Sequence, residues 1–141
     1  DTKPELLVRK ALHARGFRFS LHSKKLPGSP DLVLAKHKAV IQVQGCFWHG
    51  HQDCYRYKPP KSRVEYWQQK IARNQARDER NKQALLAEGW RLLVVWECAI
   101  QGKTKLASEV LAELIENWIL VGNDYAELRG NPEKDIASVA R

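Results

Sequence analysis

Methionine is absent from the 141-residue sequence, and no apolar run approaches the roughly 20 residues that a membrane span needs. The sequence also lacks a signal-peptide pattern, in which a basic start, an apolar stretch and a small-residue cleavage site follow one another. These absences favour a cytoplasmic protein with no membrane partner. Since the chain starts at Asp1 and holds no methionine, we expect the natural protein to have a further N-terminal segment.

Cysteine is scarce, and its three residues cannot all pair as disulfides. In an intracellular protein such thiols more often bind a metal or take part in catalysis. Cys46, His51 and Cys54 follow the spacing Cys-x4-His-x2-Cys, and thiolates with imidazole are the ligands of tetrahedral zinc. Cys98, the remaining cysteine, comes just after an apolar run and would complete a closed, structural site. The alternatives are that the cysteines are small buried hydrophobes, or that His49 competes with His51.

Acidic residues are outnumbered: 16 Asp and Glu face 24 Lys and Arg, for a formal net charge of +8. This balance favours polyanionic partners, with nucleic acid first, although a basic surface without function is the alternative. At this length the chain fits one domain, residues 1–141, which hides roughly 68–70% of the surface that its unfolded chain exposes.

The alternation of apolar and polar residues predicts an α/β domain. A capping box at residues 2–5 begins a helix that Gly16 ends, and a short strand follows at residues 17–19. Residues 31–35 and 39–43 form a hairpin, residues 63–87 a long helix, residues 91–96 a central strand, and residues 105–119 a helix that packs on the sheet. An irregular insert spans about residues 45–63, and a weakly structured tail is expected at about residues 122–141.

Asp31 follows a proline and begins the first strand of the hairpin. Nucleases of the restriction-endonuclease-like fold carry a metal-binding acid in such a position, and magnesium prefers carboxylate oxygens. The partner strand has Gln42 and Gln44 where these enzymes usually have an acid and a lysine. Because neutral amides bind cations poorly, fewer protein charges would hold the metal. Proton transfer would also have to come from another group. His49 is the nearest candidate, since an imidazole with an ordinary pKa of about 6.5 suits acid–base work near neutrality; a solvent-facing loop histidine is the alternative.

The long helix carries two polar residues on an apolar stripe. At 100° per residue, Asn74 and Asp78 share one face with Trp67 and Ile71. Polar groups that are buried on such a face need partners. Asn74 and Asp78 therefore either form structural hydrogen bonds or reach into the active site, where they could contact His49.

Cations and aromatic rings surround this region of the sequence. A second line of side chains on the long helix is basic and consists of Lys70, Arg73, Arg77 and Arg80. This line could follow a phosphate backbone, and the alternative is a solvated face. The aromatic residues interleaved with basic ones are Phe47, Trp48, Tyr55, Tyr57, Tyr66 and Trp67. Apolar wedges can unstack a base step, and a mismatched step yields most readily. The alternative is a small satellite core around the insert.

The sequence resembles the very short patch repair (Vsr) endonucleases in four segments, found at residues 1–5, 26–31, 45–51 and 95–98. They read Asp-Thr-Lys-Pro-Glu, Leu-Pro-Gly-Ser-Pro-Asp, Gly-Cys-Phe-Trp-His-Gly-His and Val-Trp-Glu-Cys. The resemblance implies a restriction-endonuclease-like fold, with a central mixed β-sheet flanked by helices and a zinc-stapled loop insert. It also implies a magnesium-dependent endonuclease that nicks double-stranded DNA beside the thymine of a T·G mismatch, the product of 5-methylcytosine deamination.

The resemblance also implies roles by position. Asp31 and the carbonyl of Val43 would bind magnesium, and His49, Glu5 and Asp78 would take part in catalysis. Gln44 stands where some members carry a second histidine, so the protein would rely more on His49 or use another proton path. The expected zinc ligands are Cys46, His51, Cys54 and Cys98. The aromatic rings expected to contact DNA, by resemblance, are Phe47, Trp48 and Trp67. The cations expected to contact DNA, from their charge, are Lys70, Arg73 and Arg77.

Two other functions fit the same motifs. A sequence-specific or structure-specific nuclease could keep this fold, and equal cutting of homoduplex and T·G duplexes would favour it. A zinc-stabilised DNA-binding module without catalysis is suggested by Gln42 and Gln44. We further expect a monomer that works at the bacterial nucleoid and meets other repair proteins.

Overall fold

Five strands form one mixed sheet, in the order β1-β2-β3-β4-β5, in the computed structural model, which describes residues 2–133. The strands are β1 (Ser20–Leu21), β2 (Leu32–Leu34), β3 (Ala39–Gln44), β4 (Arg91–Trp96) and β5 (Tyr125–Leu128). The first three strands pair antiparallel, whereas β4 pairs parallel with both β3 and β5. A short 3₁₀ turn, η1 (Ala35–His37), closes the expected hairpin between β2 and β3.

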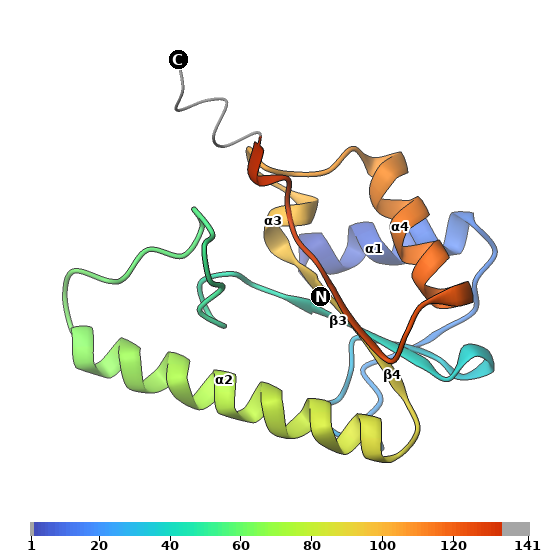
Figure 1. Ribbon diagram of the computed structural model, residues 1–141, viewed down its shortest axis with the longest axis horizontal. Coiled ribbons are helices and arrows are strands. Elements are labelled where there is room, and N and C mark those ends of the chain that lie inside the picture. The colour runs from blue at the N-terminus through green and yellow to red at the C-terminus, as the bar shows by residue number, and fades with distance from the viewer. Residues whose placement is uncertain (1, 134–141) are drawn as a thin grey trace.

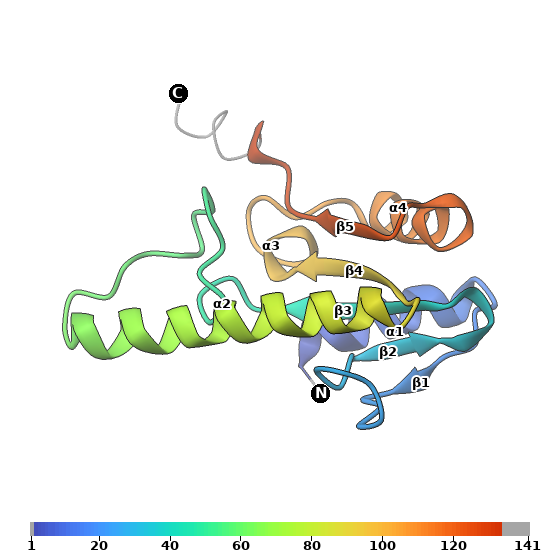
Figure 2. The same cartoon turned by 60° about the horizontal axis from the view of Figure 1, so that its bottom comes forward.

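Helices cover both faces of the sheet (Figure 2). One face packs on α1 (Lys3–Ala14), α3 (Glu97–Ile100) and α4 (Ser108–Val121), which contribute Val8, Leu12, Ile115 and Ile119 to the larger core. The opposite face, which includes Val40 and Val94, packs on α2 (Val64–Ala87) through Leu85. Because β4 is buried on both faces, its continuous apolar sequence matches its place inside the sheet. The expected fold class, a mixed sheet flanked by helices, is confirmed.

Two expectations about the ends of elements are wrong. The strand expected at residues 17–19 forms later, at Ser20–Leu21, because Phe17 and Phe19 pack against the larger core instead of pairing. The expectation of a weakly structured tail is wrong for residues 125–128, since they form β5, a parallel edge strand on β4. Its short sequence carries little apolar periodicity, and only pairing with β4 defines it. Residues 134–141 lie outside the described part of the chain.

The segment between β3 and α2, residues 45–63, contains neither helix nor strand and leaves the sheet as a long excursion (Figure 1). It ends at Arg63, whose left-handed backbone (φ 52°) precedes the first turn of α2. Within residues 2–133, no helix is both long enough and apolar enough to cross a membrane.

Candidate active site and metal centre

Three ligand-type side chains converge where α1 meets the start of β2. One atom each of Glu5, His22 and Asp31 lies within 4.8 Å of the other two. His22 Nε2 is 2.8 Å from Glu5 Oε2 and 3.6 Å from Asp31 Oδ1. Thr2 caps α1 by accepting a hydrogen bond from the Glu5 N–H, but the Glu5 carboxylate is bound by His22 and Arg9 rather than by the cap. The expected capping box is therefore half formed, and its acid belongs to this cluster.

Asp31 is held in place from the neighbouring strand. Its Oδ2 accepts a hydrogen bond from the Val43 N–H (2.7 Å), and its own N–H donates to Gln42 Oε1 (3.3 Å). Burial raises the pKa of Asp31 to about 6, the Val43 N–H opposes this rise, and the carboxylate of Glu5 adds to it. Two carboxylates that are unfavourable to ionise together are stabilised by a cation. The oxygen and nitrogen atoms of this cluster fit a divalent ion.

His49 and Asp78 form a hydrogen-bonded pair on the other side of the strand end. His49 lies in the loop after β3, Asp78 lies on α2, and His49 Nδ1 is 2.5 Å from Asp78 Oδ2. Because this contact orients the imidazole through Nδ1, Nε2 is the atom suited to exchange a proton with a substrate. Of the two roles considered for Asp78, the contact with His49 is the one that the structure shows.

The rest of the polar face of α2 holds the loop that carries His49. Asn74 donates to the carbonyl of Trp48 (2.9 Å). Gln75 donates to the carbonyls of His49 and Gly50 (3.2 and 3.3 Å). Asn74 is therefore a structural residue, which binds backbone, whereas Asp78 binds the imidazole.

A cavity of about 340 Å³ lies between α2 and the sheet, and its wall includes His49, Asp78, Gln42 and Gln44. Gln44 is buried, with 7% of its surface exposed. Gln42 connects the two halves of the site, because its side chain lines the cavity and also accepts the hydrogen bond from Asp31 N–H. The carboxylate and the imidazole thus lie at the same end of β3.

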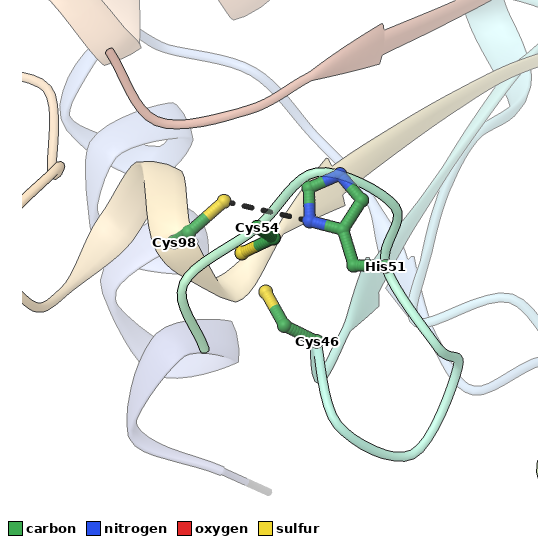
Figure 3. A group of neighbouring side chains, drawn as sticks. All are labelled: Cys46, His51, Cys54 and Cys98. Atoms are coloured by element: carbon green, nitrogen blue, oxygen red, sulfur yellow. Dashed lines mark hydrogen bonds between the residues drawn. The ribbon is translucent and has the colours of Figure 1, made fainter. Parts of the chain in front are cut away.

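A second cluster brings together Cys46, His51, Cys54 and Cys98 (Figure 3), with one ligand atom of each within 4.8 Å of the others. Cys98 Sγ lies 3.7 Å from His51 Nδ1. Tetrahedral zinc, with bonds of about 2.3 Å to sulfur and 2.0–2.1 Å to nitrogen, separates such atoms by roughly 3.5 Å. The donor types and their spacing fit zinc, and the expected ligand set comes together in space.

The thiols of this cluster are already suited to hold a cation. A hydrogen bond with Cys46 lowers the pKa of Cys98 to about 4 against the effect of burial, which favours the thiolate form of Cys98. The same hydrogen bond raises the pKa of Cys46. Metal binding would replace this shared proton, since a thiolate is the ligand form. All four positions belong to protein side chains, as in structural zinc sites.

Residues after β5 cover the cysteine cluster. The Gly130 N–H donates to Cys98 Sγ (3.3 Å), and Arg129 donates to the carbonyl of Asp53 (2.7 Å). On the other side His51 stacks on Trp96, with ring centroids 3.8 Å apart. The tail was expected to be weakly structured, and the pairing of β5 with β4 brings it here.

The aromatic residues of the insert gather at the start of α2. Ring centroids of Phe47, Trp48 and Trp67 lie 5.3–5.6 Å apart, and Trp48 keeps 49% of its surface exposed. Lys70 Nζ lies 5.8 Å from the Trp48 ring, while Arg73 and Arg77 are exposed farther along the helix. The rings pack on one another, and the cluster still offers an exposed edge with cations beside it.

His22 is the residue of the site that the sequence analysis missed. The only signal was a lone histidine ahead of a Pro-Asp pair, and antiparallel pairing of β1 with β2 brings the two together. The His22 N–H donates to the Asp31 carbonyl (3.1 Å), which continues that pairing by one residue.

The known proteins that this chain resembles are named as DNA mismatch endonucleases or type II nicking enzymes. The family described as DNA mismatch endonuclease Vsr matches residues 1–56, which include Glu5, Asp31 and His49. The type II nicking enzyme V.XorIIP of Xanthomonas oryzae pv. oryzae is 53% identical over 100 residues, 71% of this chain and 73% of that protein. The DNA mismatch endonuclease Vsr of Escherichia coli is 44% identical over 119 residues, 84% of this chain and 76% of that protein. The type II nicking enzyme V.NmeAIP of Neisseria meningitidis is 45% identical over 103 residues, 73% of each chain.

Proposed function

Since the chain belongs to the Vsr family of DNA mismatch endonucleases, we propose that it nicks one strand of duplex DNA beside the thymine of a T·G mismatch, with Mg²⁺ as cofactor. Family membership makes the protein a DNA endonuclease of mismatch repair. The observation that carries the finer proposal is the oriented His49–Asp78 pair, which lies beside the same strand end as the half-buried Asp31.

The divalent ion would be held by Asp31 and the carbonyl of Val43, with Glu5 nearby. When bound, it supplies positive charge to the phosphate oxygens of the scissile bond. The Val43 N–H fixes the Asp31 carboxylate, so the ligand oxygen is oriented before the ion arrives.

Proton transfer would fall to His49. Asp78 holds the ring through Nδ1, so Nε2 can take a proton from water or give one to the leaving oxygen. Gln44 lines the same cavity but carries a neutral amide, which can orient a water or a phosphate and cannot change its charge. A single imidazole would therefore carry the acid–base step.

Recognition of the mismatch would use the aromatic cluster of Phe47, Trp48 and Trp67. A mismatched step resists unstacking least, so an exposed ring can enter it for a few kcal/mol. Lys70, Arg73 and Arg77 would bind phosphates along α2. The four-residue cysteine and histidine cluster would hold Zn²⁺ and keep this loop folded.

The proposed assembly and location follow from the substrate. Every residue named for catalysis belongs to one chain, so a monomer would suffice. A mismatch in chromosomal DNA would place the protein at the nucleoid, where other repair proteins would act on the nick.

A second function has specific support, because two of the relatives described above carry the name type II nicking enzyme. The protein would then nick duplex DNA within one sequence context. Varying the base pairs that flank the T·G pair tests this: activity confined to one context would combine both functions.

The central experiment compares two end-labelled duplexes that differ only in a T·G or T·A pair. With Mg²⁺, we expect one nick in the thymine strand of the T·G duplex and none in the other. Asp31→Ala and His49→Ala should lose nicking by roughly 10²-fold or more and keep DNA binding, because each removes a chemical group and no wedge. Asp124→Ala, which alters an exposed acid, is the matched control.

Two results would contradict the proposal. Equal nicking of both duplexes would remove mismatch specificity. Tight binding without any nicking by the unmodified protein would identify a DNA-binding module that has lost catalysis.

A further inference from the structure

We propose that His22 is a direct nitrogen ligand of the catalytic divalent ion, which makes the site bind transition-metal ions such as Mn²⁺ in preference to Mg²⁺. This inference rests on the proposed function only in assuming that a cation binds at Asp31. It adds a protein ligand and a preference among cations.

The spacing of the three side chains supports shared coordination. An octahedral ion with bonds of about 2.0–2.1 Å places adjacent ligand atoms roughly 3.0 Å apart. His22 Nε2 lies 2.8 Å from Glu5 Oε2 and 3.6 Å from Asp31 Oδ1, close to that value on either side. The same imidazole nitrogen lies within 4 Å of both carboxylates, so small movements would allow one ion to bind all three groups.

The backbone holds His22 at this position. Its N–H donates to the Asp31 carbonyl (3.1 Å), and its φ of 46° turns the chain out of β1 directly after Leu21 pairs with Leu32. A non-glycine residue in the left-handed region persists only where its surroundings hold it. The imidazole is thus presented to Asp31 from the neighbouring strand rather than from a long loop.

The chemistry of the ligands determines which ion is favoured. Oxygen donors alone suit Mg²⁺, which binds nitrogen reluctantly, whereas imidazole strengthens binding of first-row transition metals. The strand beside Asp31 offers Gln42 and Gln44, which are neutral amides and weak ligands. In other nucleases of the restriction-endonuclease-like fold an acid on this strand strengthens cation binding. His22 would supply part of that affinity here.

The first test is spectroscopic and uses Mn²⁺ with zinc-loaded protein. Electron spin-echo envelope modulation should show a directly bound ¹⁴N nucleus, and this signal should disappear when the protein is labelled with [¹⁵N]histidine. The signal should persist in His49→Asn and be lost in His22→Asn. Asn is chosen because it tolerates the left-handed backbone at this position.

The second test measures affinity by titration calorimetry. His22→Asn should raise the Kd for Mn²⁺ on the order of tenfold or more, since even residues outside the ligand shell change metal affinity by 10–100-fold. The Kd for Mg²⁺ should change far less. His13→Asn makes the same substitution at an exposed position near the end of α1 and should leave both values unchanged.

The outcomes separate this inference from the proposed function. If Asp31→Asn abolishes Mn²⁺ binding while His22→Asn keeps both the ¹⁴N signal and the affinity, His22 only supports Glu5 by a hydrogen bond and the inference is wrong. If Asp31→Asn leaves cation binding intact, the proposed catalytic site is itself misplaced. The labelling experiment on unmodified protein decides the point even if a variant folds poorly.

Discussion

Asp31 combines a proposed role in cation binding with an unfavourable charge in the metal-free fold. Its pKa is raised to about 6, mainly by burial, from an ordinary value of 3.8. A raised pKa in the folded state means that the protonated form is favoured there. The stability that this form contributes is fully present below pH 3.8 and is lost as the pH rises through about 6.

Asp31→Asn should therefore stabilise the zinc-loaded protein in the absence of other divalent ions. At pH 8 we expect its free energy of unfolding to exceed that of the unmodified protein by on the order of 1–3 kcal/mol, and the difference should shrink towards pH 4. Denaturant unfolding at both pH values measures it. A variant less stable at pH 8 than the parent would contradict the assigned charge state.

Asp78 contacts His49 and would act on the proposed reaction only through that ring, as a positioning residue. Asp78→Asn keeps the shape of the side chain but removes the charge that orients and stabilises the imidazole. We expect kcat for nicking to fall by about 10²-fold or more, with KM little changed. Glu113→Gln, an exposed acid on α4, should leave both unchanged. A fall in DNA affinity alone would indicate a structural role.

At the scale of elements, we expect the insert at residues 45–63 to depend on the proposed zinc, because it has no helix or strand of its own. Cys54→Ser should abolish stoichiometric zinc in elemental analysis. Loss of about 3 kcal/mol would lower Tm by roughly 10 °C, and trypsin should cleave faster within the insert, where Lys61 and Arg63 are exposed. Retention of one zinc per chain would exclude Cys54 as a ligand.

The segment after β5 also belongs to the cysteine cluster. A Cβ at Gly130 would lie 2.3 Å from Thr104 Oγ1 and 2.5 Å from the Cys98 carbonyl, so the backbone there must shift. Gly130→Ala should reduce the free energy of unfolding by about 1–3 kcal/mol and weaken zinc binding. Asn123→Ala, exposed in the connection before β5, is the control. Normal zinc affinity in Gly130→Ala would show that this contact is incidental.

At the scale of the whole molecule, the formal charge of +8 favours binding to the phosphates of DNA. Arg73→Ala should weaken binding to T·G and T·A duplexes alike and reduce the slope of log Kd against log salt by about one. Lys36→Ala, at the far turn of the hairpin, should not change the slope. A loss confined to the T·G duplex would instead give Arg73 a role in mismatch recognition.

Most of the fold could be predicted because its elements follow local periodicity. The range of α2 and the hairpin of β2 with β3 agree with the sequence patterns, and the continuous apolar run of β4 marked a strand covered on both faces. β1 and β5 were misjudged because short strands carry little periodicity, and pairing with a neighbour decides where they form.

The sequence alone determined that thiolates and an imidazole form one candidate metal site. Cys46, His51 and Cys54 are close along the chain, so a local loop is enough to gather them. It also determined which helix face carries Asp78, through the fixed rotation per residue. Tertiary structure alone decided that His22 joins Glu5 and Asp31. Those three side chains come from separate elements, and only sheet pairing and helix packing bring such distant residues together.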